Sequence, residues 1–204
     1  MTDPVREPSR PLSRLLLLAL LLAVFGLAGP LAAAPICVTV SLGDGAELRS
    51  PTRRLLEREV DAIFRPASVE IEWGADAAAP IHLTIAARPE VRVLSGCSRG
   101  LHDHRLAVAR LGPVAGTGRV ILWVDQVTQA ASGNWDRRAP ALSEEVLARA
   151  LARALAHELG HILLGERGHH ARGIMQASLS RHDLIGSRHG FSDKQLARLS
   201  GLWR

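Results

Sequence analysis

The sequence contains no tyrosine, a single lysine (Lys194) and only 3% aromatic residues among its 204 positions. Its net charge of +5 therefore comes from arginine, and the arginines are scattered along the chain. A nucleic-acid-binding protein would combine clustered cations with stacking aromatics, so we predict that this chain does not bind nucleic acid. The length allows one domain with a substantial core and leaves little room for two.

Long apolar runs are absent except near the N-terminus. Arg6, Arg10 and Arg14 precede the run LLLLALLLAVFGLA, and small residues follow up to Ala34. This layout is typical of an export signal. The uncharged residues 15–34 could also stay as a membrane anchor, because about 20 apolar residues span a bilayer. We expect residues 1–34 to be a signal peptide or anchor, and residues 35–204 to form one monomeric domain outside the cytoplasm, secreted or periplasmic.

Cysteine is scarce, and its spacing excludes the C-x-x-C type of metal or redox motif. The chain has two cysteines, Cys37 and Cys97. Outside the cytoplasm they would meet oxidising conditions, which favours a disulfide between them over two buried free thiols.

The pattern of the exported part alternates strands and helices. Residues 50–65 have apolar residues at helical spacing, with Ser50 as the expected N-cap, and residues 191–202 read as a last amphipathic helix capped by Ser192. Strands are expected at residues 37–42, 68–73, 81–87, 104–111 and 118–127, the last two as an antiparallel pair followed by a polar loop.

A longer helix from Ser143 to about Leu164 carries the most informative motif, HELGH at residues 157–161. His157 and His161 are four residues apart, so their imidazoles lie one turn apart on one face and can reach a single zinc ion. Around the helix axis Glu158 lies next to these two histidines, close enough to hold a metal-bound water molecule without being a ligand itself.

A third protein ligand has to come from the chain after the helix, since zinc sites with an open position use three. A continuing helix would carry later residues too far along its axis, so Gly165 and Gly168 are expected to turn the chain back through left-handed backbone angles. His169 and His170 are the main candidates. We favour His169 because it directly follows Gly168. Glu166 could also coordinate, although it sits within the turn itself.

Residues 157–175 resemble the metzincin zinc peptidases, whose pattern is H-E-x-x-H-x-x-G-x-x-H followed by a turn with a methionine. Here the pattern reads HELGHILLGERGH with GIM at residues 173–175, one residue longer before the glycine and one more before the third histidine. The spacing is also similar to bacterial exported proteins that carry HELGHLLLG…HS…GIM. The resemblance is specific in this segment and loose elsewhere.

The resemblance implies an α+β, metzincin-like fold with a twisted mixed sheet of about five strands, an active-site helix, a methionine turn and a C-terminal helix. It also implies one catalytic zinc ion held by His157, His161 and His169, with Glu158 as general base and acid and Met175 beneath the metal. Many metzincins use a tyrosine to assist the transition state. Without one, we expect zinc and main-chain donors to stabilise the oxyanion. His182 or His189 could assist, but we favour both as solvated loop residues.

The prediction is an exported zinc endopeptidase that cuts peptide bonds of peptide or protein substrates by attack of a zinc-activated water. Two alternatives remain open: a non-catalytic zinc-binding module, and a zinc hydrolase of a non-peptide amide such as one in the cell wall. Glu158 favours an enzyme, because a purely structural site needs no base.

We expect His82 to be structural and His102 and His104 to be surface residues.

Overall fold

The computed structural model describes residues 36–74, 78–86, 106–114, 116–133, 141–187 and 190–201. The chain divides after Ala34, and all described residues belong to the second unit, Pro35–Arg204. The predicted signal or anchor lies outside the described residues and stays a prediction. In the part that the structure describes, no helix combines the length and the apolar character needed to cross a bilayer.

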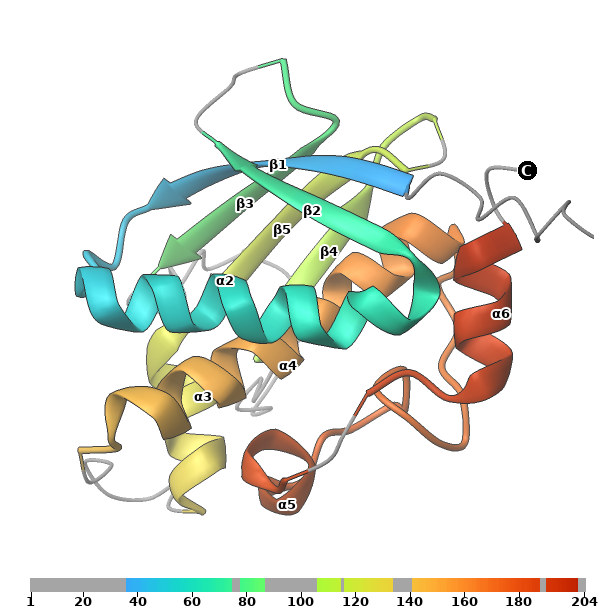
Figure 1. The fold of residues 1–204 in the computed structure, drawn as a ribbon. Coiled ribbons are helices and arrows are strands. Elements are labelled where there is room, and N and C mark those ends of the chain that lie inside the picture. The colour runs from blue at the N-terminus through green and yellow to red at the C-terminus, as the bar shows by residue number, and fades with distance from the viewer. Residues whose placement is uncertain are drawn as a thin grey trace, which may run out of the picture. The chain divides into compact units, whose positions relative to one another are not determined.

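A five-stranded sheet forms one layer of this unit (Figure 1). Four strands are parallel, and the edge strand β4 pairs antiparallel with β5, as the sequence predicts. The predicted mixed sheet of about five strands is therefore confirmed. In spatial order the strands are β2 (Val69–Gly74), β1 (Ile36–Asp44), β3 (Ile81–Ala86), β5 (Gly118–Trp123) and β4 (Ala107–Leu111).

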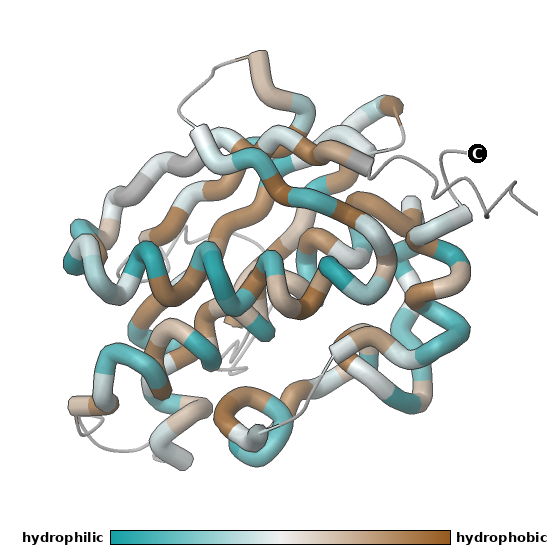
Figure 2. Tube along the Cα trace, viewed as in Figure 1, coloured by the Kyte–Doolittle hydropathy of each residue, from teal (hydrophilic) through white to brown (hydrophobic). Residues whose placement is uncertain are grey.

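The strands present one apolar face to two helices, α2 (Ser50–Phe64) and α4 (Glu144–Leu164). Burial alternates along the strands, as a period of two residues requires: in β3, Ile81, Leu83 and Ile85 are buried, while the side chains between them are more exposed. Figure 2 shows the same alternation of hydrophobic and hydrophilic segments along the strands. The core therefore lies between the sheet and these helices.

Helix α4 is the central helix of the unit. Every residue from Ala150 to Leu164 except Glu158 is buried, which is the pattern of a helix surrounded by other elements. Its bounds follow the sequence prediction: the Ser143 side chain caps the N-terminus by accepting from the Val146 N–H, and Gly165 ends the helix with a left-handed φ of 64°. The helix that carries HELGH is thus defined at both ends by local sequence signals.

Helix α2 starts one residue earlier than predicted. Ser50 is the first helical residue, Arg49 occupies the N-cap position, and no side chain caps the helix. The predicted N-cap role of Ser50 is therefore wrong. Thr52, Leu56, Val60 and Phe64, spaced four residues apart, form its buried face.

The predicted strand at residues 118–127 is wrong after Trp123, because the chain turns into helix α3 (Val124–Ser132). The partner strands end at the same place: Trp123 pairs with Ala86, the last residue of β3. Beyond this point Val127, Ala130 and Ala131 are buried at helical spacing. The branched residues that suggested a longer strand serve the buried face of a helix instead.

Two short elements and a final helix are the other elements of the described residues. A 3-10 turn, Arg65–Ala67, follows α2, and helix α5 (Arg181–Ile185), which the sequence did not suggest, is capped by a reciprocal pair of contacts between Ser180 and Asp183. Helix α6 (Asp193–Gly201) matches the predicted last helix, with Ser192 directly before it.

The predicted Cys37–Cys97 disulfide has no support in this structure. Cys37 is an exposed free thiol at the start of β1, with its Sγ 3.8 Å from a carboxylate oxygen of Glu72. Partial desolvation of the sulfur and the nearby Glu72 carboxylate raise the pKa of this thiol. Cys97 lies outside the described residues, so the bridge stays a prediction.

Candidate metal centre

Helix α4 places His157 and His161 side by side on its buried side. Residues four apart share a face of a helix, and here the two ring centroids are 4.7 Å apart with their Nε2 atoms separated by 3.1 Å. Both residues are at least nine-tenths buried. The two nitrogens therefore point toward one common position.

A main-chain carbonyl fixes the orientation of each ring. His157 Nδ1 donates to the carbonyl of Ile174 at 2.7 Å, and His161 Nδ1 donates to the carbonyl of Glu166 at 2.7 Å. With the proton on Nδ1, each Nε2 keeps a free lone pair, the form in which histidine binds metal. Both rings are thus prepared as ligands by the residues that follow the helix.

His169 comes from the loop after α4 and completes a group of three imidazoles. Its ring centroid lies 5.3 Å from that of His157 and 5.0 Å from that of His161. One nitrogen from each ring can be chosen so that all three lie within 4.8 Å of one another. Three imidazole donors suit zinc, and the exposure of His169 leaves a side open to solvent. The donor set therefore fits a zinc ion with an accessible position.

His170 points to a different partner. Its Nε2 lies 3.0 Å from a carboxylate oxygen of Glu166, and its main-chain N–H donates to the carbonyl of Met175 at 2.8 Å. The Glu166 carboxylate, the other ligand considered from the sequence, binds His170 and Arg198. The structure therefore brings His169, and neither of these two, to the helix histidines.

The turn that leads to His169 uses only one of the two glycines expected to be left-handed. Gly165 has a positive φ, but Gly168 does not. The reversal is made at Gly165, where the Glu166 N–H also bonds the His161 carbonyl at 3.1 Å. The left-handed role expected of Gly168 is therefore wrong.

Met175 packs directly beneath the helix segment that carries the histidines. It is fully buried, and a Cβ added to Gly160 would come within 2.4 Å of its Sδ. The lack of a side chain at Gly160 lets the methionine approach the helix backbone beside His161. Gly173, with a φ of 77°, forms the turn that delivers Ile174 and Met175 to this position.

Burial is the main electrostatic influence on the helix histidines. It lowers the pKa of His157 from 6.5 to about 4, against the opposing hydrogen bond to the Ile174 carbonyl. Burial also lowers the pKa of His161. Hydrogen bonds from His170 and Arg198 hold the pKa of Glu166 below its usual value, so that its carboxylate is ionised. At neutral pH the helix rings are therefore neutral and able to accept a metal.

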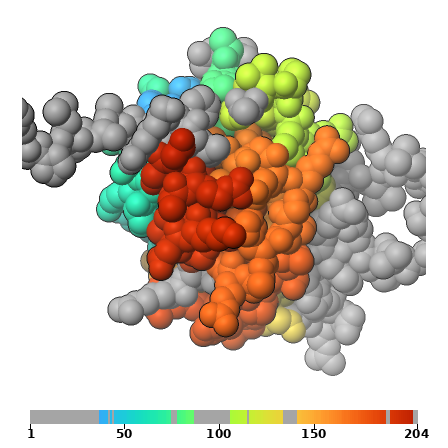
Figure 3. All heavy atoms as spheres, turned by 90° about the vertical axis from the view of Figure 1, so that its right-hand side faces the viewer, coloured from blue at the N-terminus to red at the C-terminus, as the bar shows by residue number. Residues whose placement is uncertain are grey.

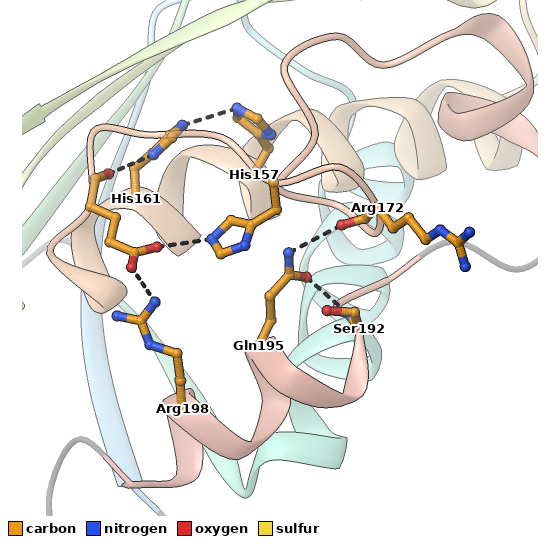
Figure 4. Close-up of polar contacts among 8 residues, drawn as sticks. His157, His161, Arg172, Ser192, Gln195 and Arg198 are labelled. Atoms are coloured by element: carbon orange, nitrogen blue, oxygen red, sulfur yellow. Dashed lines mark hydrogen bonds and ion pairs between the residues drawn. The ribbon is translucent and has the colours of Figure 1, made fainter.

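Helix α6 contacts the loops that follow α4, and Figure 4 shows its residues Gln195 and Arg198 near His157 and His161. The buried Gln195 accepts from the Ser192 N–H at 2.8 Å and donates to the Arg172 carbonyl at 3.2 Å, and Arg198 pairs with Glu166. In Figure 3 the red of α6 lies beside the orange of the chain that follows α4. Gln195, Arg198 and Arg172 were not among the site residues predicted from the sequence. A signal for Gln195 was present, because Ser-x-x-Gln at residues 192–195 is a capping-box pattern.

The remaining predicted site residues have different placements. Glu158 follows His157 on α4 and is half-buried. His82 lies on β3 and is partly buried, and His182 is exposed on α5. His102, His104 and His189 lie outside the described residues.

No protein-family model and no curated protein matches this chain. Among solved structures, it is similar to the crystal structure of archaemetzincin from Methanopyrus kandleri, with a TM-score of 0.53 and 14% identity over 86% of this chain and 98% of that one. It is also similar to a zinc-dependent peptidase from Methanocorpusculum labreanum, with a TM-score of 0.47 and 13% identity over 78% of this chain and 99% of that one. The first similarity shows a shared fold and confirms the predicted metzincin-like α+β architecture.

Proposed function

We propose that this chain is a zinc-dependent endopeptidase that acts outside the cytoplasm. The observation that carries the proposal is the group of His157, His161 and His169 beside Glu158, with three ligand nitrogens within 4.8 Å of one another. The shared fold with archaemetzincin supports the same interpretation. The export layout of residues 1–34 supports the location.

In the proposed site, His157, His161 and His169 hold one zinc ion through their ring nitrogens. When bound, zinc supplies a Lewis acid that polarises the peptide carbonyl and acidifies the attacking water. The carbonyls of Ile174 and Glu166 keep the two helix rings in the tautomer that this role needs.

In this proposal Glu158 is the general base. It follows His157 on α4, so its carboxylate belongs beside the ligands rather than among them. In the proposed reaction it accepts a proton from the attacking water and then delivers that proton to the departing amine, which breaks the peptide bond. His169 is exposed, so in this proposal a peptide approaches the site from the side of His169.

The test compares purified protein with the variant Glu158→Gln. We expect both proteins to contain one zinc ion, and only the parent to hydrolyse unfolded casein, because the glutamine keeps the size of the side chain and removes its basicity. Glu145→Gln, on the exposed first turn of the same helix, is the matched control and should leave hydrolysis unchanged.

Three other results would contradict the proposal or part of it. Zinc bound by a parent that cleaves no peptide would favour a non-catalytic module. Release of a non-peptide amide product, with casein left intact, would favour the cell-wall type of hydrolase. Equal casein hydrolysis by zinc-loaded parent and Glu158→Gln would exclude Glu158 as the base.

A further inference from the structure

The loop between the second and third histidines is longer than in the metzincin pattern. That pattern places the third histidine six residues after the second, whereas His169 follows His161 by eight. A longer loop has more conformations to lose when it is ordered, so it needs more contacts to hold its ligand in place. Gly168 adds freedom directly before the ligand.

Glu166 is the residue through which this loop is connected to its surroundings. Its N–H donates to the His161 carbonyl at 3.1 Å, and its own carbonyl accepts from His161 Nδ1 at 2.7 Å. Its carboxylate binds His170 Nε2 at 3.0 Å and, through the other oxygen, Arg198. One residue therefore contacts a helix ligand, the neighbour of the loop ligand, and helix α6.

His170 extends these contacts to the methionine turn. Its main-chain N–H donates to the Met175 carbonyl at 2.8 Å, while its side chain holds Glu166. His169 stands between Gly168 and this doubly held residue. Fixing His170 therefore fixes one end of the backbone that presents the His169 ring.

The contact between the Glu166 and His170 side chains is partly protected from solvent. The side chains of Glu166 and His170 are 27% and 26% exposed, so they are screened less than an ion pair fully in solvent. The Glu166 carboxylate also receives two charged or chargeable donors, one from its own loop and one from α6. Such contacts hold a ligand loop more firmly than an isolated surface pair would.

We propose that Glu166, held by Arg198 and His170, is a positioning residue that sets the affinity of the site for its metal by holding the longer ligand loop against α6. The proposal rests on the metal ligands named under the proposed function. Glu166 does not bind the metal in this arrangement: it orients His161 through its main chain and His169 through its side chain. The side-chain part can be removed by mutation while the main-chain part remains.

The experiment measures zinc affinity of the full chain by competition with a chromophoric chelator. We expect Glu166→Ala and Arg198→Ala each to weaken zinc binding by about 10- to 100-fold, the usual effect of losing a partner that orients a metal ligand. The double variant should be no weaker than Glu166→Ala alone, since both changes remove the same contact. Glu166→Gln and Arg198→Lys should restore part of the affinity.

The matched control is Glu144→Ala, which removes another carboxylate paired with an arginine, Arg49, away from the ligand loop. Its zinc affinity should equal that of the parent. Two further measurements separate positioning from damage to the fold. The metal-free variants should unfold at nearly the denaturant concentration of the parent, and the visible absorption of the Co²⁺-loaded Glu166→Ala protein should change in shape.

Zinc affinity of Glu166→Ala within twofold of the parent, at an unchanged unfolding midpoint, would overturn the positioning role and leave the proposed function standing. Additive losses in the double variant would overturn the claim that Arg198 acts through Glu166. A parent chain that binds no zinc would overturn both this proposal and the proposed function.

Discussion

Gly160 decides how closely the methionine turn approaches the ligand helix. A Cβ at this position would meet Met175 Sδ at 2.4 Å and Phe191 Cε1 at 3.1 Å, and both side chains are buried. Gly160 is therefore the place where the helix with the HELGH motif packs against side chains from distant parts of the chain. This makes it a sensitive point for a small substitution.

We predict that Gly160→Ala destabilises the protein by on the order of 1 kcal/mol. Overpacking a filled core costs about 1–3 kcal/mol, and the higher helix propensity of alanine returns about 1 kcal/mol. Denaturant unfolding of the metal-free protein measures the change. Gly201→Ala, at the last residue of α6, where the new methyl group meets nothing within 4 Å, is the control and should be neutral or stabilised by up to about 1 kcal/mol through helix propensity alone. A stabilised Gly160→Ala variant would contradict the packing described here.

The lowered pKa of His157 predicts how the stability of the metal-free protein depends on pH. The ring titrates near its ordinary 6.5 when unfolded and at about 4 when folded, so between these values only the unfolded state takes up the proton. The stabilisation is fully present above pH 6.5 and is lost as the pH falls toward 4. A shift from 6.5 to about 4 corresponds to a loss on the order of 3 kcal/mol.

Urea unfolding of chelator-treated protein at pH 7 and at pH 5 checks this prediction. His157→Gln, which cannot titrate, should lose less stability than the parent between the two values. Equal losses in both proteins would show that His157 does not contribute to this pH dependence.

At the scale of elements, α6 serves as a support for the loops of the site. Its last turn contacts the 3-10 turn after α2 through Ser200 Oγ, which donates to the Ala67 carbonyl at 3.0 Å. Gln195, on the buried side, holds the Ser192 N–H and the Arg172 carbonyl together. The helix thus connects the first half of the chain with the segment before the methionine turn.

We predict that Gln195→Leu lowers the free energy of unfolding by about 1–3 kcal/mol, because the leucine fills similar space but leaves both main-chain groups without this partner. Thermal or denaturant unfolding measures the loss. Lys194→Ala, an exposed change on the same helix, should remain within about 0.5 kcal/mol of the parent. A Gln195→Leu protein as stable as this control would show that the two hydrogen bonds contribute little.

At the scale of the whole unit, a bound metal would tie the central helix to the loop after it. A ligand that binds only the native state at 100 times its Kd stabilises that state by about 2.7 kcal/mol. We therefore predict that chelation lowers the Tm and that added zinc restores it. Differential scanning calorimetry with and without zinc measures the shift.

The same assay tests which of the two adjacent histidines, His169 or His170, is the metal ligand. His169→Ala should abolish the zinc-dependent shift, since it removes a ligand, whereas His170→Ala should reduce the shift and keep it measurable. The reverse order would show that His170 is the ligand and His169 its support.

By itself, the sequence determined the features that depend on neighbouring residues along the chain. The helix with HELGH, its Ser143 cap, its end at Gly165 and the shared face of His157 and His161 all follow from the period of a helix and from side-chain and glycine preferences. The alternation of apolar and polar residues likewise predicted the strands, whereas the mixed sheet was implied by the resemblance to the metzincins. The same local rules put the N-cap of α2 at Ser50 instead of Arg49, because a serine and a proline at a helix start are compatible with more than one position.

Only the tertiary structure decided what depends on contacts between distant segments. Residues 124–127 became helical because their partner strands end at Trp123, and His169 rather than His170 faced the helix histidines because Glu166 and Met175 hold His170. The support from Arg198 and Gln195 comes from a helix some thirty residues beyond the motif. The spacing of residues along the sequence determines which side chains share a helix face, because the hydrogen bonds of a helix are local. The orientation of a side chain in a loop depends on contacts with segments that only folding brings near.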